Sequence, residues 1–273
     1  MRGLRHTLTP ALSRQRERGQ STMLETQDLT IRFGGHVAVD HVTCAFAPGT
    51  LTAIVGPNGA GKTTYFNLIS GQLRASEGKV LLNGIDITNE ATPARTHRGL
   101  GRAFQLTQLF PNLTVLENVR LAVQSQRKEG INLWSVWLSQ RETLDRAQAL
   151  IERVKLGDRA GASASSLPHG DQRKLEVAML MALDPSVYMF DEPTAGMSVD
   201  DVPVILDLIR ALKSQRDKTI LLVEHKMDVV RELADRIIVL HNGQLVADGE
   251  PAAVIASPVV QQAYLGMAAA EPA

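Results

Sequence analysis

The chain has 273 residues, of which 44% are hydrophobic, so it is long enough to bury a substantial core. No apolar run approaches the roughly 18 residues that a membrane-spanning helix needs, and the single cysteine, Cys44, excludes an internal disulfide and suits a packed thiol. The net charge is zero, but residues 1–22 carry five arginines and one acid, which leaves the rest mildly acidic. An acidic body argues against nucleic acid as the main ligand, because proteins that bind the phosphate backbone usually present a basic face.

The first 22 residues show neither hydrophobic periodicity nor helix capping, and they lack the apolar segment of a secretory signal. We therefore expect a disordered basic extension there, with ordered structure beginning at Met23. Whether Met1 or Met23 is the true start stays open, as does a role for the extension as a basic arm that binds lipid or nucleic acid. A flexible tail rich in alanine and proline is expected over residues 267–273.

Hydrophobic residues alternate from Leu24 to Cys44 on either side of Gly34-Gly35, which predicts two antiparallel strands. A short apolar strand over residues 51–55 then leads into a glycine-rich loop and a helix. Residues 56–63 match the pattern G-x-x-x-x-G-K-[ST], in which backbone N–H groups surround phosphate oxygens, the lysine reaches the β and γ phosphates and the hydroxyl binds Mg²⁺. The predicted ATP-binding residues of this loop are Gly56, Pro57, Asn58, Gly59, Ala60, Gly61, Lys62, Thr63 and Thr64.

Strands and helices alternate again near the C-terminus, which predicts a mainly parallel sheet covered on both faces. The expected strands are residues 187–190, 219–223 and 236–240, and the expected helices lie around 202–212 and 227–233. Residues from about 114 to 183 show no convincing strand. Helical spacing over 114–126, 134–154 and 172–183 predicts a helical insertion in an α/β domain.

Two acids, Asp191 and Glu192, follow the apolar strand that ends at Phe190. The carboxyl end of a parallel strand is where ligands bind in such sheets. There, Asp191 can hold Mg²⁺ through water, while Glu192 can polarise an attacking water. Alone, this pair is more often a solvated loop. Together with a phosphate loop, it indicates a P-loop ATPase.

The segment Leu167-Pro168-His169-Gly170-Asp171-Gln172-Arg173 resembles the signature motif of the ABC ATPase superfamily. Gln105 resembles the Q-loop glutamine of that family, His225 its switch histidine and Phe33 the aromatic residue that stacks on adenine. The six features occur in the family's order over residues 24–265. The resemblance implies catalytic roles for Glu192, His225 and Gln105, Mg²⁺ ligation by Thr63, Gln105 and Asp191, and ATP contacts from Phe33 and from Gly170, Asp171 and Gln172 of a paired chain.

The resemblance also implies an α/β P-loop NTPase fold over residues 23–266, with a mainly parallel core sheet, an N-terminal antiparallel β-subdomain and an inserted α-helical subdomain at about 114–183. Two such domains are expected to pair head to tail, as a homodimer or as a heterodimer with a paralogue, with ATP between them. The other implied partners are two transmembrane permease subunits and, indirectly, a periplasmic solute-binding protein. The expected location is the cytoplasmic face of the inner (plasma) membrane, with no nucleic acid bound.

The chain departs from the family pattern in two places. Pro168-His169 replaces the usual Ser-Gly of the signature, so a serine hydroxyl expected on the γ-phosphate is absent. Ser198 stands where an aspartate is common, which puts communication across the paired domains in doubt.

Four features look like the ATPases of branched-chain amino-acid importers. They are residues 101–119, Phe33-Gly34-Gly35, the variant Gly170-Asp171-Gln172-Arg173 and the ending Ala263-Tyr264-Leu265-Gly266. Related urea and amide importers share much of this pattern, so an ATPase of that kind is a second hypothesis. A soluble ABC ATPase that acts on DNA or the ribosome is a third, and an exporter ATPase is a fourth. An apolar cluster over residues 133–138 fits either a contact with a membrane subunit or the core of the insertion.

Overall fold

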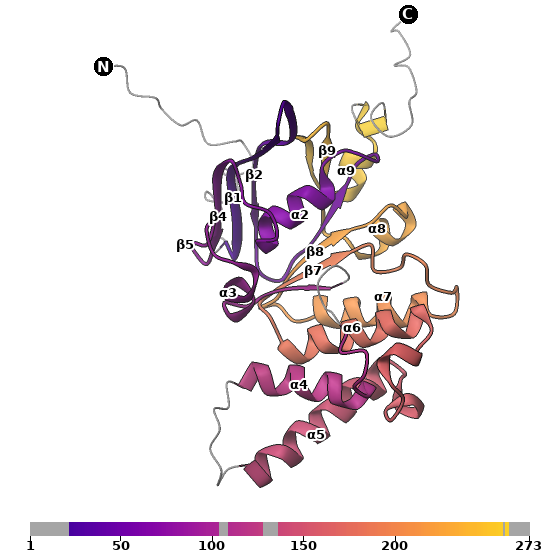
Figure 1. Ribbon diagram of the computed structural model, residues 1–273. Helices are drawn as coiled ribbons and strands as arrows, with labels where there is room; N and C mark the ends of the chain where they lie inside the picture. The colour runs from indigo at the N-terminus through magenta and orange to yellow at the C-terminus, as the bar shows by residue number, and fades with distance from the viewer. Residues whose placement is uncertain (1–21, 104–108, 128–135, 259, 262–273) are drawn as a thin grey trace, which may run out of the picture. The chain divides into compact units, whose positions relative to one another are not determined.

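The computed structural model describes residues 22–103, 109–127, 136–258 and 260–261, and the chain forms two compact units (Figure 1). Unit 1 comprises Met1–Arg98 and Arg216–Ala273, and unit 2 comprises Gly99–Gln215. The expected tail at 267–273 and all but the last residue of the expected extension at 1–22 lie outside the described residues. Both expectations therefore stay predictions.

Unit 1 contains a four-stranded antiparallel sheet with the order β2-β1-β4-β5. Its strands are β1 (Leu24–Phe33), β2 (His36–Phe46), β4 (Glu77–Leu82) and β5 (Ile85–Asp86). The two predicted antiparallel strands are confirmed, because β1 pairs antiparallel with β2 and Leu24 lies opposite Phe46. The sequence pattern did not predict β4 or β5. Only Val80 and Leu82 of β4 are buried, which is too little alternation to read as a strand.

A second set of strands in unit 1 includes the strand that leads into the phosphate loop. It consists of β3 (Leu51–Val55), β8 (Thr219–Val223), β9 (Arg236–His241) and β10 (Gln244–Gly249), in the order β10-β9-β3-β8. As predicted, β3 runs parallel to β8 and β9, whereas β10 is antiparallel to β9. Every residue of β3 and β8 is buried, which explains why these strands read as continuous apolar runs. The helices of unit 1 are α2 (Lys62–Ser70), α3 (Thr92–His97), α8 (Met227–Leu233) and α9 (Pro251–Ile255).

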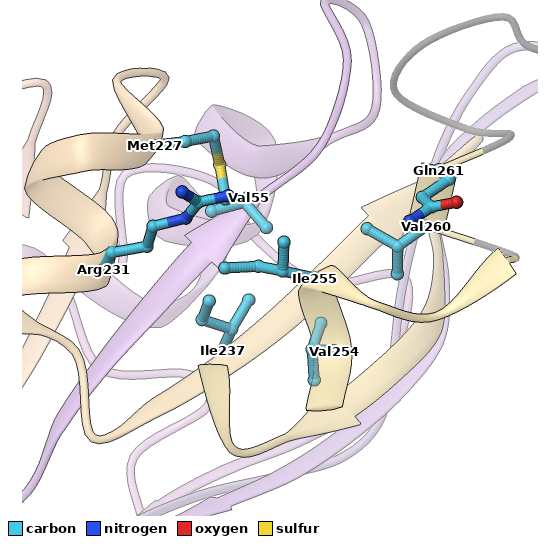
Figure 2. Close-up of a pocket in the computed structure, with 8 residues that line it drawn as sticks. All are labelled: Val55, Met227, Arg231, Ile237, Val254, Ile255, Val260 and Gln261. Carbon is cyan, nitrogen blue, oxygen red and sulfur yellow. The ribbon is translucent and has the colours of Figure 1, made fainter. Parts of the chain in front are cut away.

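An apolar pocket of about 170 Å³ lies in unit 1 beside the end of β3 (Figure 2). Its walls are formed by Val55, Met227, Arg231, Ile237, Val254, Ile255, Val260 and Gln261. Four of these residues also belong to a buried cluster, in which valines of α9 and of the segment after it pack on β3 and β9. Since Val55 immediately precedes the phosphate loop, α9 helps to support the strand from which that loop starts.

Cys44 is a packed thiol in unit 1, as its place in an alternating strand predicted. Burial raises the pKa of the thiol to about 12, so it stays protonated at neutral pH. Nearby, the Arg236 guanidinium donates to both carboxylate oxygens of Asp248, at 2.5 and 2.6 Å, and to the Ala45 carbonyl at 2.5 Å. The arginine thereby links β9 and β10 of one sheet to β2 of the other.

Unit 2 contains the helical insertion and two parallel strands, β6 (Leu100–Ala103) and β7 (Val187–Asp191). Its helices are α4 (Val115–Arg127), α5 (Val136–Arg153), α6 (His169–Leu183) and α7 (Val202–Lys213), with short 3₁₀ turns η1 (Gly157–Arg159) and η2 (Ala164–Ser166). Helices α4, α5 and α6 pack against one another, which confirms three helices in the predicted insertion. The helix predicted from Gln172 begins three residues earlier, at His169, because Pro168 has the extended backbone of an N-cap.

The strand β6 was not predicted, because its four residues are too few to show a pattern.

Among the described residues, no helix is both long and apolar enough to cross a membrane.

Candidate nucleotide-binding site

The loop over residues 56–64 connects the buried end of β3 to the start of α2 in unit 1. It has backbone conformations and close contacts that require glycine. Gly61, the N-cap of α2, has φ +96°, and a Cβ built on it would lie 2.5 Å from the carbonyl oxygen of Ala38. A Cβ on Gly56 would lie 2.2 Å from the carbonyl oxygen of Leu240. The loop is therefore held between β2 and β9 at distances that exclude a side chain.

Lys62 turns its side chain back over this loop. It is 6% exposed, and its Nζ donates to the carbonyl oxygens of Gly56 at 2.7 Å and Pro57 at 2.9 Å. The N-cap of α2 is a glycine, so this position has no side chain that could cap the N–H groups of the first turn. A helix start of this kind, a glycine loop and a lysine ammonium together make a suitable site for phosphate groups.

Thr63 and Thr64 lie in the first turn of α2, where Thr63 is exposed and Thr64 is half-buried. The described residues contain no cluster of three or more His, Cys, Asp or Glu side chains that could hold a metal by themselves. Mg²⁺ does not need such a cluster, because it commonly keeps several waters and takes only one or two protein ligands beside substrate phosphates. The Thr63 hydroxyl is one suitable ligand.

Two further predicted residues, Phe33 and His225, belong to unit 1. Phe33 ends β1 and is 49% exposed, so part of its side chain is accessible for stacking. His225 lies two residues after β8 and is also exposed. Its backbone N–H donates to Glu224 Oε2 at 2.8 Å, and the N–H of Lys226 donates to the same oxygen at 3.2 Å. The buried Glu224 carboxylate thus shapes the turn that presents His225, a role that the sequence pattern did not predict.

Asp191 and Glu192 lie in unit 2, at the carboxyl end of β7, as predicted. Asp191 Oδ2 accepts a hydrogen bond from Arg102 Nη2 at 2.7 Å, and the two side chains are only 10% and 3% exposed. Burial lowers the pKa of Arg102, and the Asp191 charge opposes that shift. Glu192 has a left-handed backbone with φ +52°, which turns the chain sharply after the strand. The partner Arg102 was not predicted, because nothing in the sequence pairs β6 with β7.

The signature segment forms the N-terminus of α6 in unit 2, as predicted. Asp171 accepts a hydrogen bond from Lys174 at 3.0 Å and forms an ion pair with Arg159 at 3.1 Å, while Gln172 Nε2 donates to the Leu167 carbonyl at 2.9 Å. Gln105 lies outside the described residues, as do residues 133–135 of the apolar cluster at 133–138, whereas residues 136–138 begin α5. Unit 1 thus contains the phosphate loop, Phe33 and His225, and unit 2 contains the acids and the signature segment.

A family model described as ABC transporter matches residues 39–195, a span that includes the phosphate loop, Asp191 and Glu192. The chain is also 38% identical over 251 residues to the high-affinity branched-chain amino acid transport ATP-binding protein LivG of Escherichia coli K12, covering 90% of this chain and 98% of LivG. The chain belongs to the ABC transporter family. As an ABC cassette it is a nucleotide-binding ATPase, which confirms the fold and the enzyme class predicted from its motifs.

Solved structures of other cassettes have the same fold. A nucleotide-free ATP-binding cassette from an ABC transporter superposes with a TM-score of 0.76 at 30% identity, covering 90% of this cassette and 100% of that one. A dimeric cassette bound to ADP and phosphate in a post-hydrolysis state superposes with a TM-score of 0.73 at 26% identity, covering 84% and 99% of the two chains.

Proposed function

We propose that this cassette hydrolyses ATP to drive the uptake of branched-chain amino acids through separate membrane subunits. The observation that carries the proposal is the similarity to LivG, which extends over nearly the whole of both chains. LivG is named as the ATP-binding protein of a branched-chain amino acid transporter. Residues 101–119, which distinguish this branch of the family by resemblance, support the same solute class.

In the proposed mechanism, the loop over residues 56–64 surrounds the phosphates of ATP, and Phe33 stacks on the adenine. Lys62 exchanges its hydrogen bonds with the Gly56 and Pro57 carbonyls for bonds with the β and γ phosphates, so its charge stabilises both the bound nucleotide and the transition state. The ammonium is already positioned over the loop, so little side-chain reordering accompanies binding.

The two acids at the carboxyl end of β7, Asp191 and Glu192, have separate roles in the proposal. Glu192 accepts a proton from the attacking water, and His225 and Gln105 orient that water and the γ-phosphate. Thr63, Gln105 and Asp191 would hold Mg²⁺, which would neutralise phosphate charge. Arg102 balances the Asp191 charge in the absence of a cation, since it is a buried partner at 2.7 Å. Gly170, Asp171 and Gln172 contact the nucleotide held by a second cassette.

The proposed partners follow from the family. The cassette pairs with a second copy or a paralogue and binds two transmembrane permease subunits at the cytoplasmic face of the inner membrane. A periplasmic solute-binding protein is a partner only indirectly, through those permease subunits. Nucleic acid is not a proposed ligand.

The mechanism is tested by two variants with opposite consequences. Glu192→Gln should lower single-turnover hydrolysis by on the order of 10²- to 10⁴-fold and preserve ATP affinity, because glutamine keeps the size of the side chain but cannot accept the proton. Lys62→Ala should lose much of the ATP affinity itself. Glu250→Gln, at the exposed N-cap of α9, is the matched control for loss of a carboxylate. Hydrolysis by Glu192→Gln at a rate near that of the parent would show that Glu192 is not the base.

The solute is tested by reconstituting the cassette in vesicles with its membrane subunits. We expect ATP-dependent uptake of labelled leucine, isoleucine and valine. Uptake of urea or a short amide in their place would assign the transporter to the urea and amide branch. ATPase activity that responds to DNA or ribosomes, but to no membrane subunit, would contradict a role in transport.

A further inference from the structure

Two segments that carry the departures from the family pattern touch each other inside unit 2. One is the mouth of α6, residues 169–171, and the other is the loop over residues 196–201, which leads into α7. A Cβ built on Gly170 would lie 3.0 Å from Asp201 Oδ2, and a Cβ on Gly196 would lie 3.3 Å from His169 Cε1. The segments therefore pack closely enough that neither glycine has room for a side chain without movement of its neighbour.

A buried lysine connects these two segments. Lys174, one turn inside α6, places its Nζ 3.0 Å from Asp171 Oδ1 and 2.5 Å from Asp201 Oδ1, with its side chain only 8% exposed. Asp201 Oδ2 in turn accepts from Ser198 Oγ at 2.7 Å. An unbroken series of hydrogen bonds thus runs from Asp171 through Lys174 and Asp201 to Ser198.

The hydrogen bonds of this series stabilise the charged forms of Lys174 and Asp201. Burial opposes ionisation of Lys174, but its bonds to Asp201 and Asp171 outweigh burial and raise the pKa of the ammonium. The pKa of Asp201 is lowered, first by Lys174 and then by Ser198. Arg159 supplies a second cation to Asp171 at 3.1 Å, although it is half-exposed and therefore more screened. Without Lys174, the two carboxylates that it bridges would lose their shared counter-ion.

We propose that Lys174 is a positioning residue that holds the loop bearing Ser198 against residues 169–171 at the start of α6. When a nucleotide binds at Gly170, both segments therefore move together. The consequence for turnover rests on the proposed ATPase function, whereas the mechanical connection does not. Lys174 itself touches neither nucleotide nor water in this proposal. It acts by making the two segments respond as one body.

The mechanical connection is tested by hydrogen exchange of the nucleotide-free cassette. Lys174→Met should speed exchange of the amides in residues 196–201, and Lys174→Arg should restore most of the protection, because arginine can still bridge two carboxylates. Arg120→Met removes a cation from α4 whose guanidinium contacts Gln124, and it is the control for the same change in charge. Unchanged exchange of the loop in Lys174→Met would overturn the proposal.

The catalytic consequence is tested by steady-state and binding measurements on the same variants. Lys174→Met should lower kcat by on the order of 10- to 100-fold, as expected for misplacement of a supporting segment, with the affinity of the cassette for ATP close to that of the parent. Lys174→Arg should recover most of the rate. Equal losses of kcat in the methionine and arginine variants would contradict positioning by the shared charge.

A milder variant keeps the test decisive if Lys174→Met does not fold. Asp201→Asn retains an oxygen acceptor for Ser198 but removes the charge that Lys174 bridges, so it should give faster exchange and a smaller fall in kcat. Exchange and kcat both at parental values in Asp201→Asn would also overturn the proposal. A parental cassette that binds ATP but does not hydrolyse it would refute the proposed function, while the exchange measurements would still decide the connection.

Discussion

Replacing Gly61 with alanine tests how tightly the phosphate loop is held against β2. Two costs are expected in Gly61→Ala. The residue has φ +96°, and an L side chain in a left-handed conformation costs about 1–2 kcal/mol. The new Cβ would also lie 2.5 Å from the Ala38 carbonyl oxygen, well inside van der Waals contact, and overpacking of this kind adds about 1–3 kcal/mol.

Gly59 supplies a matched control in the same loop. It has φ +78°, but a Cβ there meets no described atom within 4 Å. Gly59→Ala should therefore cost only the conformational part, about 1–2 kcal/mol, whereas Gly61→Ala should cost about 2–5 kcal/mol. The excess in Gly61→Ala is the contribution of the close contact with Ala38.

Urea unfolding of the two variants measures this difference, provided that their m-values match. Binding of a fluorescent ATP analogue should show a larger loss of affinity in Gly61→Ala, because relief of the contact moves the loop away from β2. Equal free energies of unfolding for the two variants would refute the idea that the contact with Ala38 fixes the loop.

Two further predictions concern parts of the chain away from the site. Because burial raises the pKa of Cys44 to about 12, the native thiol should resist maleimide at pH 7.5 and react fully in denaturant. The same shift in pKa should lower the free energy of unfolding as the pH rises above about 9, because the thiol ionises first in the unfolded chain. Rapid labelling of the native protein would contradict the buried position. Deletion of residues 1–22 should leave the melting temperature and the ATPase rate unchanged, and a clear loss of either would show that this segment is part of the fold.

The sequence predicted the elements whose pattern is set by burial on a fixed period. Strands β3 and β8 are buried along their whole length, so their apolar runs were readable, and the phosphate loop was readable because close backbone contacts demand glycine at set spacing. The helix α6 was predicted three residues too short, since hydrophobic spacing begins only after its polar first turn. The two-stranded addition of β4 and β5 was missed because few of its side chains are buried.

The partners of the site residues were not predictable in the same way. The pair Arg102–Asp191 joins residues 89 positions apart, and it exists only because β6 and β7 pair. Lys174 reads in the sequence as one more charge on an amphipathic helix. Its function as a bridge depends on the approach of residue 201, which no local pattern records. Local chemistry is therefore visible in a sequence, whereas the charges that hold it in place depend on tertiary contacts.

The left-handed backbone at Glu192 gives stability and the proposed activity opposite requirements at this position. A non-glycine residue at φ +52° costs of order 1 kcal/mol or more relative to glycine, so mutations selected for a more stable fold would favour loss of this side chain. The proposed base is the group that turnover requires. A library of variants sorted by thermal stability alone should accordingly accumulate inactive cassettes that have lost Glu192.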